Sequence, residues 1–227
     1  MNTGLKRVAV LGASRGLGRA TVNRLIASGG ASALFVCSRK KQLLEEIANE
    51  PSAHGISIDV FSADFSKAEE QNQVIDRLSQ WNPDTIIYCA GGGPHGVFAD
   101  KEWKDHLWAW NVSFLFPARL IHMFLPDKSV EKMIFVGSAI AESDNNALSA
   151  SYGSSKAALL SLVRAVQNGL SDVRLFSPGY MNTEMLPPNA LPRKQGVLLD
   201  PQNVAKVLLA WLDSPKDSDK ESWHKTL

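Results

Sequence analysis

The segment Tyr152-Gly153-Ser154-Ser155-Lys156 carries a phenol and an ammonium at a spacing that suits acid/base chemistry. The apolar run that follows, residues 157–160, predicts that the segment opens a helix. In a helix, a four-residue offset puts the Tyr152 and Lys156 side chains on one face, one turn apart. An ammonium beside a phenol favours the phenolate and lowers a pKa that starts at about 10. Tyr152 is therefore a candidate acid/base; the alternative is a helix start with an exposed lysine and a buried tyrosine.

A second chemical feature is a glycine-rich turn near the N-terminus, Gly12-Ala13-Ser14-Arg15-Gly16-Leu17-Gly18. It stands between an apolar run and a helical pattern. Small residues let the backbone approach a pyrophosphate, and a helix N-terminus offers free N–H groups and a positive dipole end. The spacing is Gly-x-x-x-Gly-x-Gly, not the common Gly-x-Gly-x-x-Gly. Its position after the first predicted strand nevertheless favours nucleotide binding.

The choice of nucleotide is expected to depend on residues about 20 positions past that turn, where an acid would hold a ribose diol and a base a 2′-phosphate. The sequence there is Ser38-Arg39-Lys40-Lys41, with no acid before Glu45. Arg15 in the turn is a second phosphate ligand candidate. Guanidinium groups clamp a phosphate, so the sequence favours NADP(H) over NAD(H). The alternative is a solvated helix start.

These residues need a scaffold, and the hydrophobic pattern predicts short strands alternating with helices. Strands are predicted at 8–11, 33–38, 56–61, 85–90, 133–136 and 173–176. Helices are predicted from the glycine turn to Ser28 and at 41–49, 67–81, 101–124, 152–170 and 201–212. The strands lack polar alternation, as expected when both faces of a parallel sheet are covered. The pattern therefore predicts one doubly wound α/β domain over residues 1–227.

Composition excludes several classes of partner. The 227 residues hold 24 Lys and Arg against 23 Asp and Glu, so no charge excess draws the chain to nucleic acid or anionic lipid. Cys37 and Cys89 lie in apolar runs, which favours free buried thiols in a reducing cytoplasm. We find no apolar segment of signal-peptide or transmembrane length, so a soluble, untargeted protein is expected. The histidines are scattered, and no metal site is predicted.

Two segments are expected to shape a substrate pocket. Residues 180–200 combine several prolines with large apolar side chains, among them Met181, Met185 and Leu191, which favours a mobile apolar lid over a linker. The loop 92–98 adds Val97 and Phe98. Three tryptophans, Trp103, Trp108 and Trp110, are interpreted as core or subunit-contact residues rather than ligand contacts. His95 is expected on the surface.

The motifs of this chain, taken in sequence order, resemble those of the short-chain dehydrogenase/reductase family over nearly the whole chain. The matching segments are Gly12-x-x-x-Gly16-x-Gly18, Cys89-Ala90-Gly91-Gly92, Asn111, Ser138, Tyr152-x-x-x-Lys156, and Pro178-Gly179 with Thr183. The resemblance implies that Tyr152 is the general acid/base and that Ser138 hydrogen-bonds the substrate oxygen. It also implies that Lys156 lowers the tyrosine pKa and holds the nicotinamide ribose, while Asn111 anchors a proton relay through water.

The same resemblance implies a Rossmann-like domain with a set of cofactor-binding residues: Gly12, Ser14, Arg15, Gly16, Leu17, Gly18, Ser38, Arg39, Asp64, Phe65, Ala90, Gly91, Gly92, Tyr152, Lys156, Pro178, Gly179 and Thr183. Asp64 would contact the adenine and Thr183 the nicotinamide carboxamide. Taken singly, each has another interpretation: Asp64 as a helix cap, Asn111 as a polar helix residue, Ser138 as a turn residue, or Thr183 as a loop hydroxyl.

The sequence departs from the family pattern in three places. Tyr88-Cys89 stands where an asparagine pair is usual, one extra residue separates Ser138 from Tyr152, and the segment after the last helix leaves room for only a short further strand, or none. We expect a homodimer, with tetramer formation open. The expected activity is NADP(H)-dependent reduction of a small carbonyl compound or oxidation of the alcohol. The alternative is a non-catalytic NADP(H)-binding sensor with the same fold.

Overall fold

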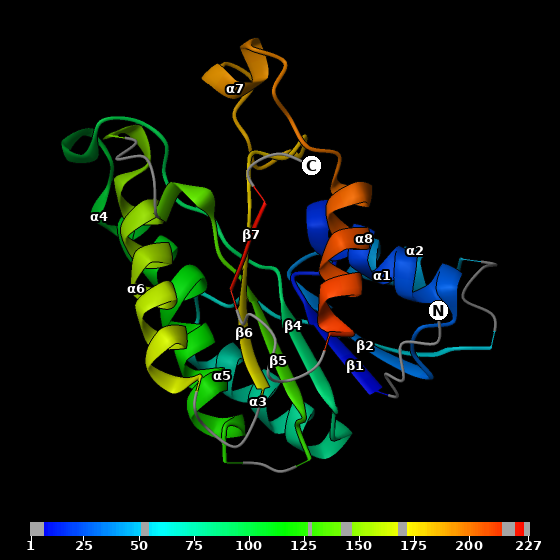
Figure 1. Cartoon of the computed structure of the whole chain (residues 1–227). Coiled ribbons are helices and arrows are strands. Elements are labelled where there is room, and N and C mark those ends of the chain that lie inside the picture. The colour runs from blue at the N-terminus through cyan, green and yellow to red at the C-terminus, as the bar shows by residue number, and fades with distance from the viewer. Residues whose placement is uncertain are drawn as a thin grey trace.

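The computed structural model describes residues 7–50, 55–126, 129–141, 147–167, 172–214 and 221–224, the last range by its backbone. Within these residues one parallel sheet has the strand order β3-β2-β1-β4-β5-β6-β7 (Figure 1). Its strands are β1 Arg7–Leu11, β2 Ala33–Ser38, β3 Ser57–Ser62, β4 Thr85–Tyr88, β5 Lys132–Val136, β6 Asp172–Pro178 and β7 Glu221–His224. The order reverses between β1 and β4, so ligands are expected at the carboxyl ends of these strands.

Helices cover both faces of the sheet, as predicted (Figure 1). One face carries α1 Gly16–Ser28, α2 Lys41–Ala48 and α8 Pro201–Leu212; the other carries α3 Ala68–Trp81, α5 Phe116–Phe124 and α6 Ala150–Val166. In β1, Ala9 and Leu11 face the second layer while Val8 and Val10 face the first, and all four are buried. The doubly wound α/β fold is confirmed.

The predicted single helix 101–124 is wrong in detail. The chain forms α4 Trp103–Trp110, then the π-helix η3 Asn111–Leu115, then α5. A π-helix closes its hydrogen bonds over five residues, so side chains on its two sides are rotated relative to a regular helix. The strand predicted to reach residue 90 ends at Tyr88. The segment after α8, for which a short strand or none was expected, forms β7, parallel to β6.

The segment between β6 and α8, which we call the lid, holds the short helix α7 Leu191–Lys194 and stands at the top of Figure 1. Its two ends are paired: Leu199 N donates to Tyr180 O at 2.8 Å, and Asn182 N donates to Leu199 O at 2.9 Å. After the lid, the Asp200 carboxylate accepts from Gln202 N at 3.1 Å and caps α8, with Pro201 in the first turn, as predicted.

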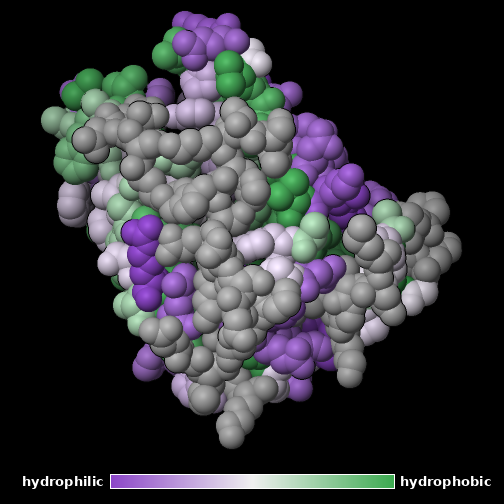
Figure 2. Space-filling view, viewed as in Figure 1, coloured by the Kyte–Doolittle hydropathy of each residue, from purple (hydrophilic) through white to green (hydrophobic). Residues whose placement is uncertain are grey.

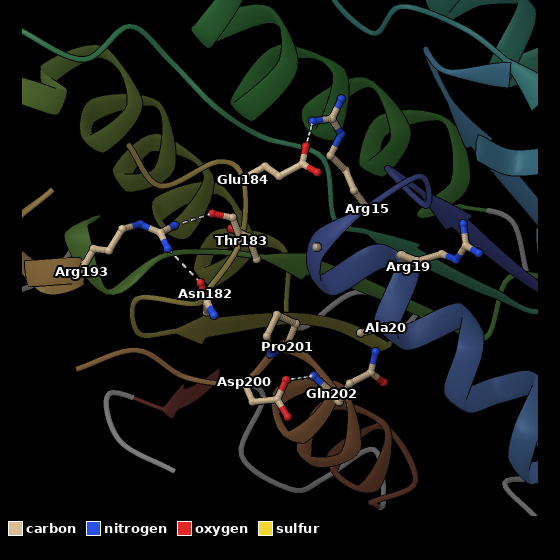
Figure 3. A pocket seen from close by; sticks show the side chains of 11 residues that line it. Arg15, Arg19, Ala20, Asn182, Thr183, Glu184, Arg193, Asp200, Pro201 and Gln202 are labelled. Atoms are coloured by element: carbon tan, nitrogen blue, oxygen red, sulfur yellow. Dashed lines mark hydrogen bonds and ion pairs between the residues drawn. The ribbon is translucent and has the colours of Figure 1, made fainter. Parts of the chain in front are cut away.

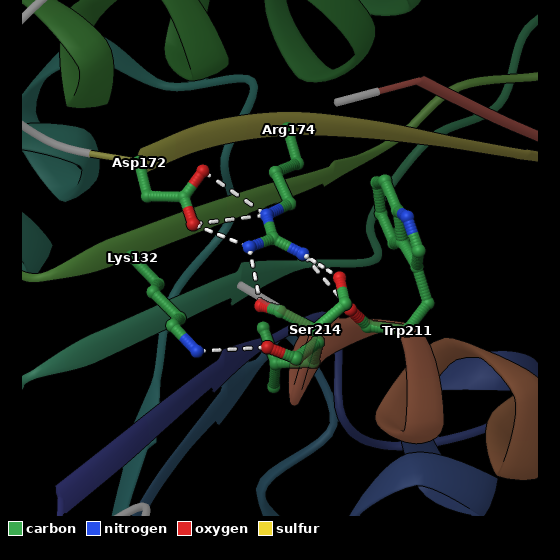
Figure 4. Close-up of polar contacts among 6 residues, drawn as sticks. Lys132, Asp172, Arg174, Trp211 and Ser214 are labelled. Atoms are coloured by element: carbon green, nitrogen blue, oxygen red, sulfur yellow. Dashed lines mark hydrogen bonds and ion pairs between the residues drawn. The ribbon is translucent and has the colours of Figure 1, made fainter. Parts of the chain in front are cut away.

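The other end of α8 is held by a buried ion pair in β6 (Figure 4). Arg174 binds both oxygens of Asp172, and both side chains are almost fully buried. The same guanidinium donates to Trp211 O at 2.8 Å and Ser214 O at 2.9 Å, and Lys132 Nζ donates to Leu212 O at 2.8 Å. Carbonyls at a helix C-terminus lack partners within the helix, so these contacts fix where α8 ends.

Parts of three sequence predictions lie outside the described residues. They are residues 142–146 of the predicted loop 139–151, the end of the predicted helix 152–170, and His54 among the scattered histidines.

Candidate active site

The glycine turn joins β1 to α1 in a space that side chains would fill. A Cβ on Gly12, whose φ is +93°, would lie 2.6 Å from Ala90 N, and a Cβ on Gly18 would lie 2.2 Å from Gly12 O. Ser14 is half-buried in the turn and Leu17 is buried beneath it. The first turn of α1 holds no acidic residue, so its positive end can accept an anion at the carboxyl edge of the sheet.

Tyr152 lies half-buried near the start of α6, beside the loop that follows β5. Burial raises its pKa to about 12, a hydrogen bond with the Ser138 hydroxyl pulls the pKa down in part, and nearby Tyr180 adds to the rise. The extra residue between Ser138 and Tyr152 therefore does not keep the two hydroxyls apart. Lys156 is not among the groups that shift the pKa of Tyr152 in this structure, where burial dominates, so its role in lowering that pKa stays a prediction.

Lys156 lies under the glycine loop that follows β4. Its ammonium is 2.6 Å from Val136 O, to which it donates, and 5.8 Å from the centre of the Tyr152 ring. Burial lowers the pKa of Lys156 to about 8, and Cys89 counteracts this in part. A Cβ on Gly91 would lie 3.1 Å from Nζ, so a larger residue there would press on the ammonium. The structure thus brings Ser138, Tyr152 and Lys156 together at the carboxyl ends of β4 to β6.

Asn111 is the first residue of the π-helix η3. Its side-chain amide donates to Ser66 O at 3.1 Å, at the start of the α3 layer. Ser113 instead reaches the glycine loop: its hydroxyl accepts from Gly92 N at 3.2 Å and donates to Gly92 O at 3.1 Å. Regular helical spacing could not single out Ser113, because the π-helix decides which side chain faces the site. The relay role of Asn111 stays a prediction.

The residues expected on the adenosine side divide into two groups. Arg39 is exposed, with its guanidinium carbon 5.4 Å from the centre of the Trp108 ring, and Ser38 is buried beside it. Trp108 packs against the core, as interpreted, and its ring also lies beside Arg39 at the candidate cofactor site. Trp103 is not a core residue, because it is 67% exposed.

Asp64, Phe65 and Ala90 make mainly structural contacts. Asp64 Oδ1 accepts from Ser66 N at 2.9 Å and from Ser66 Oγ at 2.8 Å, which forms a turn before α3; the N-cap of α3 is Lys67, so Asp64 is not a helix cap. The Phe65 ring is buried 5.0 Å from that of Phe116. Ala90 packs on the same core.

The lid lies directly on the glycine turn (Figure 3). Pro178 and Gly179 lead from β6 into the lid, and the Thr183 methyl is 3.4 Å from the place a Gly16 Cβ would take. Glu184 forms an ion pair with Arg15. A cavity of about 470 Å³ lies between α1, this part of the lid and the start of α8.

The start of α6 is also tied to the loop after β4, through contacts that the sequence did not reveal. His106 Nε2 donates to Phe98 O at 3.2 Å, because a carbonyl can only accept, and Nδ1 then accepts from the Ser151 hydroxyl at 2.6 Å. Gly96 N donates to Leu148 O at 2.8 Å. His95, expected on the surface, is half-buried and lies 3.3 Å from Ser149 Oγ. Together these contacts hold the helix turn that carries Tyr152.

In the part of the chain that the structure describes, no three His, Cys, Asp or Glu side chains gather in a metal-binding cluster. No helix in that part is long and apolar enough to cross a membrane.

Comparison with known proteins agrees with the geometry. The sequence profile described as short chain dehydrogenase matches residues 6–193. A cyclic-di-GMP-binding biofilm dispersal mediator protein of Escherichia coli K12 is 25% identical, over 94% of this chain and 91% of its own length. The 3-oxoacyl-[acyl-carrier-protein] reductase FabG of Salmonella typhimurium is 26% identical, over 85% and 80%.

Solved structures show the same fold. An alcohol dehydrogenase from the archaeon Thermococcus sibiricus, complexed with 5-hydroxy-NADP, superposes with a TM-score of 0.83 and 25% identity, over 96% of this chain and 95% of that one. BdcA in complex with NADPH superposes with a TM-score of 0.79 and 22% identity, over 96% and 91%.

Proposed function

The chain belongs to the short chain dehydrogenase family, and from that premise we propose that it transfers hydride between NADP(H) and a carbonyl or alcohol substrate. The observation that carries the proposal is the contact between the Ser138 hydroxyl and the Tyr152 phenol, with the Lys156 ammonium on the same helix face. Carbonyl reduction needs a proton donor and a second hydrogen bond to the oxygen that gains charge. Tyr152 and Ser138 supply these two groups.

The residues fit a dinucleotide. The turn at Gly12 and Gly18 has no room for a Cβ, and the first turn of α1 is free of acids. When bound, NADP(H) supplies or accepts the hydride. We assign its phosphates to the glycine turn and to Arg15 and Arg39, and its nicotinamide half to the side of Lys156 and Thr183. The preference for NADP(H) over NAD(H) rests on these two arginines and on the lack of an acid at the end of β2.

The protonation states favour reduction at neutral pH. Burial raises the pKa of Tyr152 to about 12, so near pH 7 the phenol holds the proton that the alkoxide must receive. Alcohol oxidation needs the phenolate and is therefore expected to quicken as the pH rises. Lys156, with a pKa of about 8, keeps its positive charge below that pH.

An apolar substrate is supported by exposed apolar side chains on segments that adjoin the candidate catalytic residues. Exposed apolar residues occur on the loop after β4, before α6 and on the lid: Val97, Phe98, Leu148, Tyr180, Met185, Leu191 and Val197. Figure 2 shows hydrophobic surface both on the lid and at the α4 end of the molecule. We also propose that the exposed Trp103 and Leu107 of α4 contribute to a homodimer contact and that the protein acts in the cytoplasm.

A second candidate is a non-catalytic NADP(H)-binding sensor. It is favoured by the name of the relative that binds cyclic-di-GMP, and by Tyr88-Cys89 at the place of the usual asparagine pair. A sensor has no need of a proton donor beside a second hydroxyl, which favours the enzyme.

The test is to titrate purified protein with NADPH and NADH and then follow NADPH absorbance against a panel of apolar ketones and aldehydes. We expect turnover by the wild type, and a loss of at least about 100-fold in Tyr152→Phe with NADPH binding retained. Tight NADPH binding without turnover would instead support the sensor. Full activity in Tyr152→Phe would exclude Tyr152 as the acid.

A further inference from the structure

The ion pair between Arg15 and Glu184 joins the phosphate-binding turn to the lid. Figure 3 shows Glu184 reaching from the lid to the guanidinium. The two side chains are 41% and 71% exposed, so a dissolved anion can reach the guanidinium that Glu184 holds.

The lid segment that carries Glu184 is braced. Arg193 Nη1 donates to Asn182 Oδ1 at 2.9 Å, and Nη2 donates to Thr183 O at 3.0 Å and Leu186 O at 3.2 Å. The Thr183 methyl rests on the glycine turn. Glu184 is therefore presented to Arg15 by a shaped loop and not by a free chain.

The Glu184 carboxylate occupies a position whose positive charge would also attract a phosphate. Arg15 is the N-cap residue of α1, and the first turn of that helix holds no acid of its own. A positive helix end next to a guanidinium attracts an anion, and in this structure the anion is the Glu184 carboxylate. The pyrophosphate is common to both cofactors, but only NADP(H) adds a 2′-phosphate that can replace the carboxylate on the Arg15 guanidinium; the uncharged ribose diol of NAD(H) cannot.

We propose that Glu184 is a specificity-determining residue: its carboxylate competes with the cofactor 2′-phosphate for Arg15, so NADPH binding breaks the pair and NADH binding leaves it intact. The inference rests on the proposed function, in which Arg15 binds that phosphate. Because Glu184 belongs to the lid, binding of the 2′-phosphate to Arg15 also releases the lid from the glycine turn.

The experiment measures the affinity of wild type and Glu184→Gln for NADPH and NADH by cofactor fluorescence. Glu184 is exposed, so its loss should leave folding unchanged. Because exposed ion pairs are weak, we expect NADPH to bind about two- to fivefold more tightly in Glu184→Gln and NADH to bind as in the wild type.

Glu50→Gln is the matched control. Glu50 pairs with Arg19 at 2.7 Å, one turn along the same helix, so the variant removes an equal charge from another arginine of α1. It should change neither affinity. Three outcomes would overturn the inference. The NADPH affinity could rise equally in Glu50→Gln, Glu184→Gln could change the affinity for both cofactors equally, or Glu184→Gln could bind NADPH more weakly. If the wild type binds NADPH and Glu184→Gln does not differ from it, the inference fails alone; if neither protein binds NADPH, the proposed function fails with it.

Discussion

At the scale of the residue, Lys156 bears the largest conflict between charge and environment near the site. Its ammonium is buried against Val136 O, and its pKa of about 8 lies below the ordinary 10.5. Below pH 8 both the folded and the unfolded chain hold the proton, so the folded state carries the full penalty of a buried charge. Between about pH 8 and 10.5 only the unfolded chain keeps the proton, and the penalty fades as the pH rises.

Lys156→Met should therefore be more stable than the wild type at pH 7, by on the order of 2–3 kcal/mol, although it loses activity. The advantage should shrink as the pH rises from 8 to 10.5. Urea unfolding at pH 7, 8.5 and 10 measures it, with Lys41→Met as the control because Lys41 is exposed. A stability difference that stays constant over this range would show that Lys156 is not destabilised by its charge.

At the scale of the element, apolar spacing predicted which segments are helices and strands, but not how the long helix before β5 is built. Each hydrogen bond of a π-helix spans one residue more than in an α-helix, and no residue type in Asn111–Leu115 predicts this change. For that reason Asn111 could be matched to a motif, while Ser113, which holds Gly92, could not be found. The sequence also could not reveal the hydrogen bond between His106 and Ser151, because it joins α4 to α6, two helices that are distant in the sequence.

The anchor at the end of α8 gives a prediction at this scale. Arg174→Met should lower the free energy of unfolding by about 3–5 kcal/mol, because it leaves the Asp172 carboxylate buried without its partner. The double variant Asp172→Leu with Arg174→Met should recover much of that loss, since no charge is then buried. Urea denaturation of the three proteins measures both effects; equal losses in single and double variants would contradict this account.

At the scale of the whole molecule, the alternation of strand and helix patterns was enough to predict the doubly wound sheet. The electrostatics of the site was not predictable, because it depends on burial. The pKa of Tyr152 is the clearest case: the four-residue offset does bring Lys156 to within 5.8 Å of the Tyr152 ring centre, but burial is the main influence on the phenol and raises its pKa to about 12. Burial acts in the same way on the thiols, raising the pKa of Cys89 to about 12 and that of Cys37 as well.

Neither thiol should therefore react readily in the folded protein, because the thiolate is the reactive form. We expect a disulfide reagent at pH 8 to label Cys37 and Cys89 only as urea unfolds the chain, with the labelling midpoint equal to the midpoint followed by circular dichroism. A free cysteine in a small peptide is the control for reagent quality. Rapid labelling of one thiol in the native protein would show that its strand end opens locally.

The two ends of the lid are hydrogen-bonded to each other, which allows the segment between them to be exchanged. Tyr180, Asn182 and Leu199 meet where β6 ends and α8 is about to begin, so the chain between them leaves the fold and returns at a single point. A loop closed in this way tolerates a changed length or sequence at little entropic cost, and neither the sheet nor α8 has to move. An engineer who wishes to change which molecules enter the pocket can therefore graft another segment between Glu184 and Leu199 and keep Thr183 and Glu184 against the glycine turn.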